Sequence, residues 1–215
     1  KATIIIVNNT FKLDKEVSIN DSSIQENLKT LEKFLDKNIF FLEKKLNSYI
    51  KEINLIINYE DLFTLNLSSI DNFNNYIKDS NKVSNFLLTI KNNVTQNMHG
   101  YDLIHMMINQ FIIDGKEYSS ISNDQNYNNL YFEIRFIWLK NDILKSLKKI
   151  FSKYEILIKN ISSYEYVNSF EYPEADNTFD LADKLMNGLN QKEIFFNNRP
   201  SKNIGFFEKF FNLFQ

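Results

Sequence analysis

The sequence predicts an α+β fold, because short β-branched segments and longer amphipathic segments follow one another along its 215 residues. From Ile24 to Leu46, apolar residues recur at steps of three and four, which is the period of a helix with one apolar face. Residues 129–140 alternate between two sets of side chains, which is the period of a half-buried strand. The length allows one medium domain, or a domain with appendages, with a sizeable core.

The first third of the chain predicts strands around a long helix. Ser22, with Gln25 three residues later, has the pattern of a capping box at the start of that helix. Polar residues around Glu60 and Asp61 predict a turn that joins two strands into a pair. Residues 68–80 are predicted as loop. The strands themselves are predicted at residues 2–7, 16–19, 53–57 and 62–67.

The rest of the chain predicts further helices and strands. A helix is expected to begin near Ser80, and Asp114-Gly115 marks a tight turn at the end of a strand-rich stretch. Lysines within 142–154 predict a basic face on the outer side of that helix. This face is either a solvated surface or a surface close to lipid. Strands are predicted at 102–113, 129–140 and 155–167, helices at 142–154 and 180–190, a loop at 117–128, and the outward lysines are Lys145, Lys148, Lys149 and Lys153.

Composition excludes several functional classes. The 25 basic and 27 acidic residues give a formal net charge of −2, which argues against nucleic acid as a partner. The absence of cysteine excludes disulfides and thiolate metal sites. All apolar runs are shorter than the roughly 20 residues of a spanning helix. We therefore expect neither an integral membrane protein nor a bound cofactor.

The candidates for catalysis are weak, so the sequence predicts a protein that is not an enzyme. His105 lies in an apolar strand, where a packed or hydrogen-bonded histidine is commoner than a base. The pairs Glu60 with Asp61 and Glu165 with Glu171 are expected in solvated loops. His99 and His105 are the two histidines available for a metal site. Other aromatic residues either form a recognition patch or pack in the core, and these are Trp138, Tyr127, Tyr131, Tyr164, Tyr166 and Tyr172.

The C-terminal stretch RPSKNIGFFEKFFNLFQ predicts a detached amphipathic helix at 204–215 after a polar linker at 197–203. On a helical projection its apolar residues occupy one half of the circumference, and Glu208, Lys209, Asn212 and Gln215 occupy the other. Such a short helix can lie in a bilayer interface. The predicted membrane-binding residues are Arg199, Lys202, Ile204, Phe206, Phe207, Lys209, Phe210, Phe211, Leu213 and Phe214. A terminal helix that docks on its own domain or on a partner protein is the alternative.

The order of these elements resembles the inserted strand-helix-strand-strand subdomain of the bacterial cell-division protein FtsA, an actin-like membrane anchor. The resemblance covers roughly residues 16–170 and is carried by DLIHMMINQFIIDG and LYFEIRFIWLKNDILKSLKKIFSKYEILIKNISSYEYVNSF. It implies a two-layer module at 1–172, followed by a docking extension at 173–196, the linker and the membrane-targeting helix. That family also has a C-terminal amphipathic helix after a loose linker.

The chain departs from the family where nucleotide would bind. The isolated glycines Gly100, Gly115, Gly188 and Gly205 supply no clustered phosphate loop. The resemblance therefore implies a non-enzymatic scaffold at the cytoplasmic face of the bacterial inner membrane, which self-associates into a homo-oligomer or recruits cell-division proteins to anionic lipid. Two alternatives are a part of an actin-like ATPase whose nucleotide-binding half lies elsewhere, and a cytosolic pilus-type adaptor whose tail binds a protein.

Overall fold

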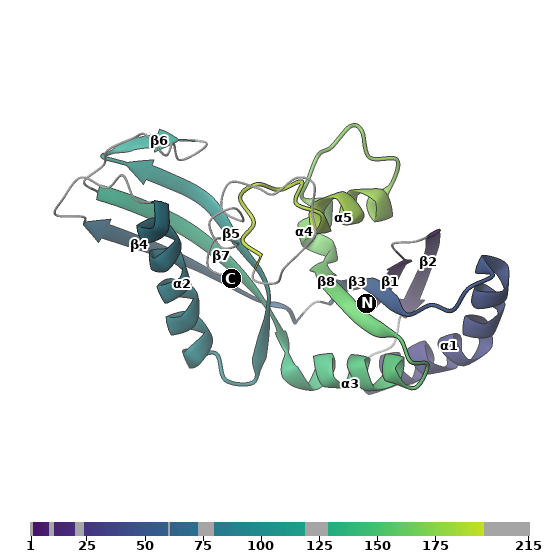
Figure 1. Ribbon diagram of the computed structural model, residues 1–215. Helices are drawn as coiled ribbons and strands as arrows, with labels where there is room; N and C mark the ends of the chain where they lie inside the picture. Colours follow the sequence, from purple (N-terminus) through teal and green to yellow (C-terminus); the bar gives the residue numbers. More distant parts are fainter. Residues whose placement is uncertain are drawn as a thin grey trace. The chain divides into compact units, whose positions relative to one another are not determined.

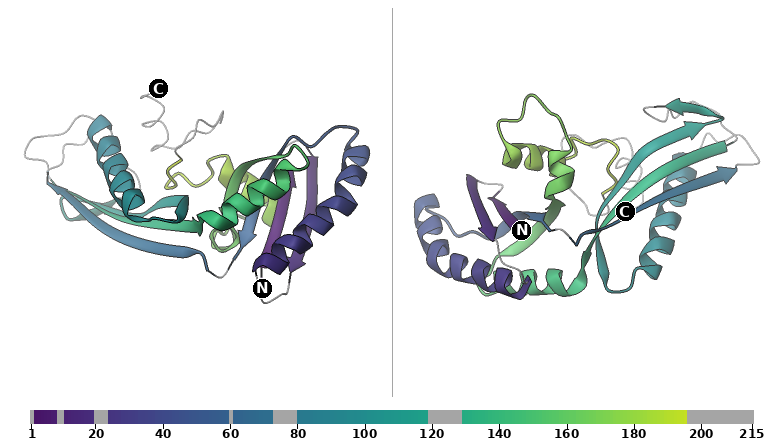
Figure 2. Two further views of the ribbon diagram at one scale, coloured as in Figure 1. Left: turned by 90° about the horizontal axis from the view of Figure 1, so that it is seen from below. Right: turned by 180° about the vertical axis from the view of Figure 1, so that it is seen from behind.

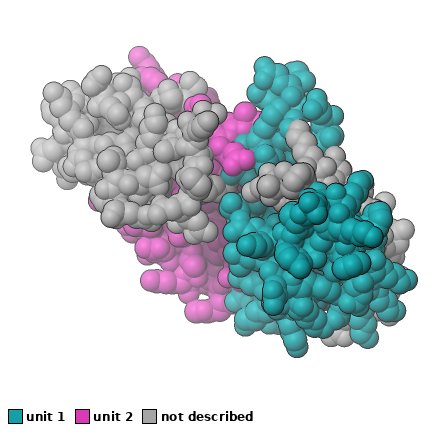
Figure 3. Space-filling view, turned by 45° about the vertical axis from the view of Figure 1, so that its right-hand side comes forward, with its two compact units in different colours: residues 1–62, 139–186 teal, residues 63–138, 187–215 magenta. Residues whose placement is uncertain are grey.

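The computed structural model describes residues 2–8, 11–19, 24–59, 61–72, 80–118 and 129–195, and these form an α+β fold as predicted. They divide into two compact units (Figure 3). Unit 1 comprises residues 1–62 and 139–186, and unit 2 comprises residues 63–138 and 187–215. The first part of unit 2 is thus inserted into the sequence of unit 1. The chain returns to unit 2 after residue 186.

Unit 1 is built on a four-stranded sheet with the order β2-β1-β3-β8. β1 pairs in antiparallel fashion with β2 and β3, whereas β3 pairs in parallel with β8. Figure 1 shows α1 and α3 on one side of this sheet and α4 and α5 on the other. The elements are β1 (Ala2–Asn8), β2 (Phe11–Ile19), α1 (Ile24–Leu46), β3 (Glu52–Asn58), α3 (Asn141–Ser152), β8 (Leu157–Ser163), α4 (Tyr164–Asn168) and α5 (Thr178–Met186).

The central strand β3 is buried from Ile53 to Ile57 because helices cover both faces of its sheet. Figure 2 shows the same two helical layers from other directions. α1 contributes Leu31, Leu35 and Leu42 to the core, and these three belong to its predicted apolar stripe. The polar Asn54 is also buried, and its side-chain oxygen accepts a hydrogen bond from Asn160 of β8 at 2.8 Å. That bond satisfies a polar group that would otherwise be costly inside the sheet.

Unit 2 is built on a second sheet with the order β4-β7-β5-β6, and α2 packs against it. Its core consists of apolar residues from α2, β5 and β7 together with Ile194. β7 buries alternate side chains through most of its length, as its period predicted. The elements are β4 (Phe63–Asn72), α2 (Ser80–Asn97), β5 (Tyr101–Ile113), β6 (Lys116–Tyr118) and β7 (Asn129–Lys140).

The turn between β5 and β6 is the one that the Asp-Gly pair predicts. Asp114 has φ 46° and Gly115 has φ 82°, which are the positive angles required by a tight hairpin turn. Glycine adopts such an angle without cost, and Asp tolerates it better than most residues. This turn sets the short β6 against the end of β5, from Phe111 to Ile113.

Three sequence predictions of local structure are wrong. β3 and β4 are not paired with each other, because β3 pairs with β1 and β8 in one sheet and β4 pairs with β7 in the other. β4 continues to Asn72 in a stretch predicted as loop, since its backbone keeps pairing with β7 down to Asn129. The predicted strand at 155–167 ends at Ser163, whose side chain caps α4 by accepting a hydrogen bond from the Tyr166 amide.

Candidate functional site

The predicted membrane-binding residues lie outside the described residues, as do Tyr127, Glu60 and the Ser22 end of the predicted capping box. Their roles therefore stay predictions. They are Arg199, Lys202, Ile204, Phe206, Phe207, Lys209, Phe210, Phe211, Leu213 and Phe214. The predicted docking extension is described up to Phe195, and it contains a polar cluster at α5 and a segment that pairs with β5.

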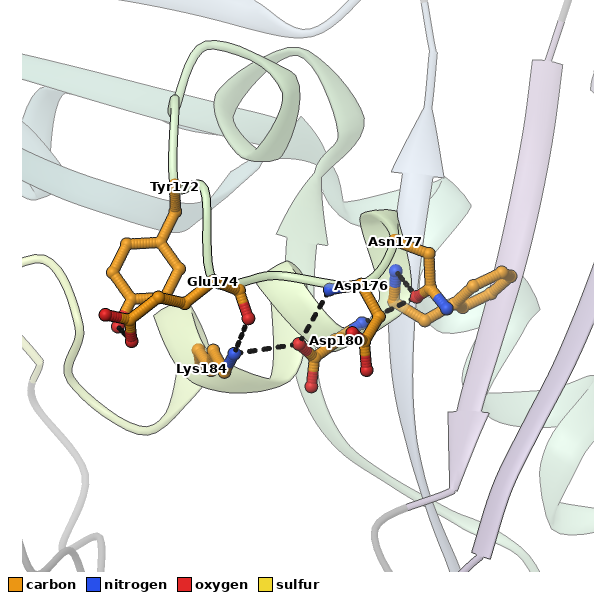
Figure 4. Close-up of polar contacts among 7 residues, drawn as sticks. Tyr172, Glu174, Asp176, Asn177, Asp180 and Lys184 are labelled. Carbon is orange, nitrogen blue, oxygen red and sulfur yellow. Dashed lines mark hydrogen bonds and ion pairs between the residues drawn. The ribbon is translucent and has the colours of Figure 1, made fainter.

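The polar cluster begins with the cap of α5 (Figure 4). Asn177 precedes the helix, and its side-chain oxygen accepts hydrogen bonds from the amides of Phe179 and Asp180, both at 3.0 Å. Asp180 reaches back in turn, and its carboxylate accepts a hydrogen bond from the Asp176 amide at 3.2 Å. These contacts satisfy amides that a helix start leaves without helical partners.

Lys184 closes the same cluster from one turn further along α5. Its ammonium group contacts the Asp180 carboxylate at 2.8 Å and donates to the Glu174 carbonyl at 2.7 Å. It also lies 5.1 Å from the centre of the Tyr172 ring. The hydrogen bond to Asp180 raises the pKa of Lys184 above its ordinary value of 10.5, so the group is held as a cation. A lysine in that state holds the 172–176 loop to α5 and is unsuited to act as a base or nucleophile.

Tyr172 is the outer member of the cluster. Its hydroxyl donates to the Glu174 carboxylate at 2.7 Å, and this bond raises the pKa of the phenol. Phenol, carboxylates and ammonium thus contact one another within a single segment of unit 1 (Figure 4). The arrangement explains how this segment is fixed, and it supplies a helix cap instead of a reactive group.

His105 forms a second polar pair, inside unit 2. Its Nδ1 lies 2.6 Å from Oε1 of Glu193, and the two side chains are 4% and 3% exposed. A hydrogen-bonded histidine is what the apolar sequence around His105 favoured. A general base must reach a substrate, whereas both members of this pair are buried. The pair therefore fits a structural role, which is to fix residues 192–194 against β5.

The other sequence candidates are not brought together. Asp61 is exposed, accepts a hydrogen bond from Tyr59 and lies 3.8 Å from Lys140. Glu165 and Glu171 are exposed on unit 1, and His99 is exposed at the end of α2. Within the described ranges, no three His, Asp or Glu side chains gather as metal ligands would. Trp138 and Tyr166 are buried, so neither contributes to an exposed recognition patch.

Sequence reasoning missed a set of exposed side chains on α1. Phe40 is 75% exposed and Phe41 is 62% exposed, although phenylalanine is normally buried. On the helical projection of the sequence, Phe40 lies on the side of α1 opposite its buried stripe, and Phe41 lies on the flank of that side. Four exposed lysines share this side. We call Lys29, Lys33, Lys37, Phe40, Phe41 and Lys44 the basic aromatic face.

The acidic residues of the same helix segment are engaged within unit 1. Glu32 forms an ion pair with Lys153, and the Asp36 carboxylate accepts a hydrogen bond from the Tyr154 hydroxyl. Glu43 accepts a hydrogen bond from the Ile50 amide at 3.0 Å. The sequence did contain a signal for this face, since Phe40 and Phe41 both fall outside the apolar stripe that predicts the helix.

No protein-family model matches the chain, and no curated protein sequence matches it either. Across the described residues, no helix is both long enough and apolar enough to cross a bilayer. The basic aromatic face and the predicted C-terminal helix are the features of the chain that best fit a binding function.

Proposed function

We propose that this protein is a non-enzymatic peripheral scaffold of bacterial cell division, attached to the cytoplasmic face of the inner membrane by its C-terminal segment. The observation that carries this proposal is the separation of apolar and polar residues at 204–215. Five phenylalanines, one leucine and one isoleucine occupy one half of the helical projection. Aromatic residues on one side and charged or amide residues on the other are typical of helices in the bilayer interface.

Physical estimates favour a weak and reversible anchor. A helix of about 12 residues is roughly 18 Å long, which suits a position parallel to the membrane. If each phenylalanine contributes roughly 1 kcal/mol, about five of them give a dissociation constant between 0.1 and 1 mM as an order of magnitude. Stable attachment then requires several linked copies, because avidity rises without new contacts. Self-association into a homo-oligomer is therefore part of the proposal.

The link to cell division rests on the resemblance of the sequence to FtsA. Unit 2 is an insertion between residues 62 and 139 of unit 1. Along the chain it runs strand, helix, strand, short strand, strand, from β4 to β7. The resemblance to FtsA covers roughly residues 16–170, which include parts of both units, and it implies a strand-helix-strand-strand subdomain. The resemblance is one of element order and hydrophobic pattern alone, and partner proteins among the division machinery are inferred from it.

Co-sedimentation of the full chain with anionic vesicles tests the proposal. We compare the unaltered protein with Phe207→Glu combined with Phe210→Glu, which places two carboxylates in the apolar half of the segment. We expect a smaller fraction of the altered protein than of the unaltered protein to pellet with the vesicles. A chain that ends at Asn198 should behave in the same way.

The matched control keeps the charge change and moves it to the polar half. Asn212→Glu with Gln215→Glu adds the same two negative charges to the same segment, and we expect most of the binding to remain. If both double variants pellet as well as the unaltered protein, the segment does not bind lipid. In that case its apolar half docks on a protein surface, and the membrane attachment proposed here is wrong.

A further inference from the structure

The outer side of the α1–α3 layer in unit 1 combines exposed aromatic side chains with lysines. Across the described part of the chain, none of the four lysines of the basic aromatic face takes part in a salt bridge. The neighbouring helix α3 exposes three further lysines on its own outer side, while it buries Ile143, Leu147, Ile150 and Phe151. These lysines are Lys145, Lys148 and Lys149.

Charge is concentrated on this layer. Residues 24–46 and 141–153 together contain nine lysines and five acidic residues, a formal charge of +4, whereas the whole chain carries −2. Glu32 pairs with Lys153, and the Asp36 and Glu43 carboxylates accept hydrogen bonds from Tyr154 and the Ile50 amide. These contacts hold acidic groups at the edge of the layer and leave lysines on the outer side of α1.

Phe40 and Phe41 add an apolar element to the positive surface. These adjacent aromatic side chains are 75% and 62% exposed, so most of their apolar surface contacts water. Their transfer to a less polar phase is favourable. Tyr49, in the turn after α1, is 82% exposed. Lysines with long apolar stems beside aromatic rings are typical of surfaces that meet the headgroup region of a bilayer.

We propose that the basic aromatic face is a second lipid-binding surface, which binds an anionic bilayer independently of the C-terminal segment. Lys29 to Lys44 span about 22 Å along the helix, long enough for several lysines to face headgroups at once. Each lysine close to an anionic surface strengthens binding about fivefold. The phenylalanines insert among the acyl chains beside those headgroups.

The composition of the face favours lipid over other polyanions or a protein partner. The chain has two arginines, Arg135 and Arg199, and the sequences of α1 and α3 contain neither. Arginine is the preferred side chain for forked contacts with nucleic-acid phosphates and is enriched in protein interfaces, from which lysine is depleted. Lysines that act as mobile point charges suit a fluid array of anionic headgroups.

The test uses the full chain and two kinds of vesicle, phosphatidylcholine alone and phosphatidylcholine mixed with phosphatidylglycerol. Lys33→Glu with Lys37→Glu removes charge from the face, and Phe40→Ser with Phe41→Ser removes its aromatic element. Each pair is also combined with the altered C-terminal segment, Phe207→Glu with Phe210→Glu. Lys116→Glu and Ile70→Ser make matched changes at exposed positions of unit 2.

We expect the lysine pair to weaken binding to the anionic vesicles at least about 25-fold, with either form of the C-terminal segment, and to leave the weak binding to phosphatidylcholine unchanged. The difference should shrink as salt is added. The phenylalanine pair should weaken binding with little dependence on salt, and the unit 2 controls should bind as the unaltered protein does. Circular dichroism and unfolding midpoints establish that every variant folds.

The outcomes separate this inference from the proposed function. If both face variants bind the anionic vesicles as tightly as the unaltered protein, the inference is overturned, whatever the C-terminal segment does. If they change only self-association, measured by sedimentation, the face is a protein interface and the lipid assignment is wrong. If binding survives alteration of the C-terminal segment and is lost on alteration of the face, this inference stands and the proposed anchor fails.

Discussion

His105 and Glu193 are 88 residues apart in sequence, yet their side chains meet at 2.6 Å inside unit 2. Around this pair, the Ile108 amide donates to the Lys192 carbonyl at 2.9 Å, and the Ile194 amide donates to the Met106 carbonyl at 2.8 Å. Ile194 itself is buried in the core of unit 2. The pair therefore joins the chain that follows α5 to the sheet of unit 2.

Glu193→Ala tests how much this pair stabilises unit 2. The change removes the carboxylate and leaves the buried imidazole without it, so we expect a loss of about 1–3 kcal/mol in the free energy of unfolding. Denaturant unfolding followed by circular dichroism measures it. Glu193→Gln, which keeps a hydrogen-bonding side chain of the same size, should lose less. An unchanged midpoint for the alanine variant would mean that the pair contributes nothing to stability.

The cap of α5 makes a second prediction. Asn177→Ala removes the oxygen that accepts from the Phe179 and Asp180 amides. The expected loss is about 1 kcal/mol of stability, as for other helix caps. Thermal unfolding of Asn177→Ala and Asn177→Ser gives the comparison, because serine can accept the same bonds. Equal midpoints for the two variants would show that the side-chain cap is not the source of the effect.

The raised pKa of Tyr154 leads us to expect that this phenol ionises late in an alkaline titration. Burial, followed by its hydrogen bond to Asp36, raises the pKa of the phenol from 10.0 to about 12. Because the folded state holds the proton more tightly than the unfolded state, this group stabilises the fold fully below pH 10 and loses that contribution as the pH rises toward 12. Ultraviolet absorbance follows the ionisation of tyrosines. It should show one phenol fewer ionising near pH 12 in Tyr154→Phe than in the unaltered protein. Asp36→Asn should move that step to lower pH, and a titration identical to that of the unaltered protein would contradict the assignment.

The core of unit 2 contains a tryptophan whose fluorescence can follow unfolding. Trp138 is the sole tryptophan of the chain and is fully buried, so its emission should be blue-shifted in the folded protein and move to the red on unfolding. Phe132→Ala opens a cavity beside Phe86 and Phe111, whose ring centres lie 6.0 and 6.4 Å from that of Phe132. We expect a loss of about 3–5 kcal/mol. Ile70→Ala, at a position 62% exposed, should change the midpoint little.

The elements predicted correctly from the sequence are those whose apolar residues repeat with the period of the element. The stripe of α1 and the alternation of β7 both record burial on one face, and both elements are found where predicted. The end of β4 was missed because residues 68–72 pair through the backbone with β7 and show no continuous apolar pattern. α4 was missed because Tyr166 and Val167 favour strands, and the Ser163 cap decides the outcome locally.

Contacts between distant residues were beyond local pattern. Neither the pairing of β3 with β8 nor the bond between His105 and Glu193 leaves a periodic signal in sequence, so the division into two units was not predicted. The basic aromatic face was missed for a different reason. The apolar stripe of α1 accounts for the helix, and the side chains opposite it are ordinarily free to vary. Phe40 and Phe41 fall outside that stripe, and their exposure in the folded chain distinguishes them from core residues.

The insertion of unit 2 has a consequence for the order in which the protein is made. β3 ends at Asn58, and its parallel partner β8 begins at Leu157, so about one hundred residues leave the ribosome before the two strands can pair. At about 5–20 residues per second, the apolar β3 waits several seconds with one edge uncovered. Unpaired apolar edges recruit other chains. The nascent protein is thus most exposed to aggregation while unit 2 is being synthesised, and early folding of β4 to β7 shortens the distance that β8 must then search to find β3.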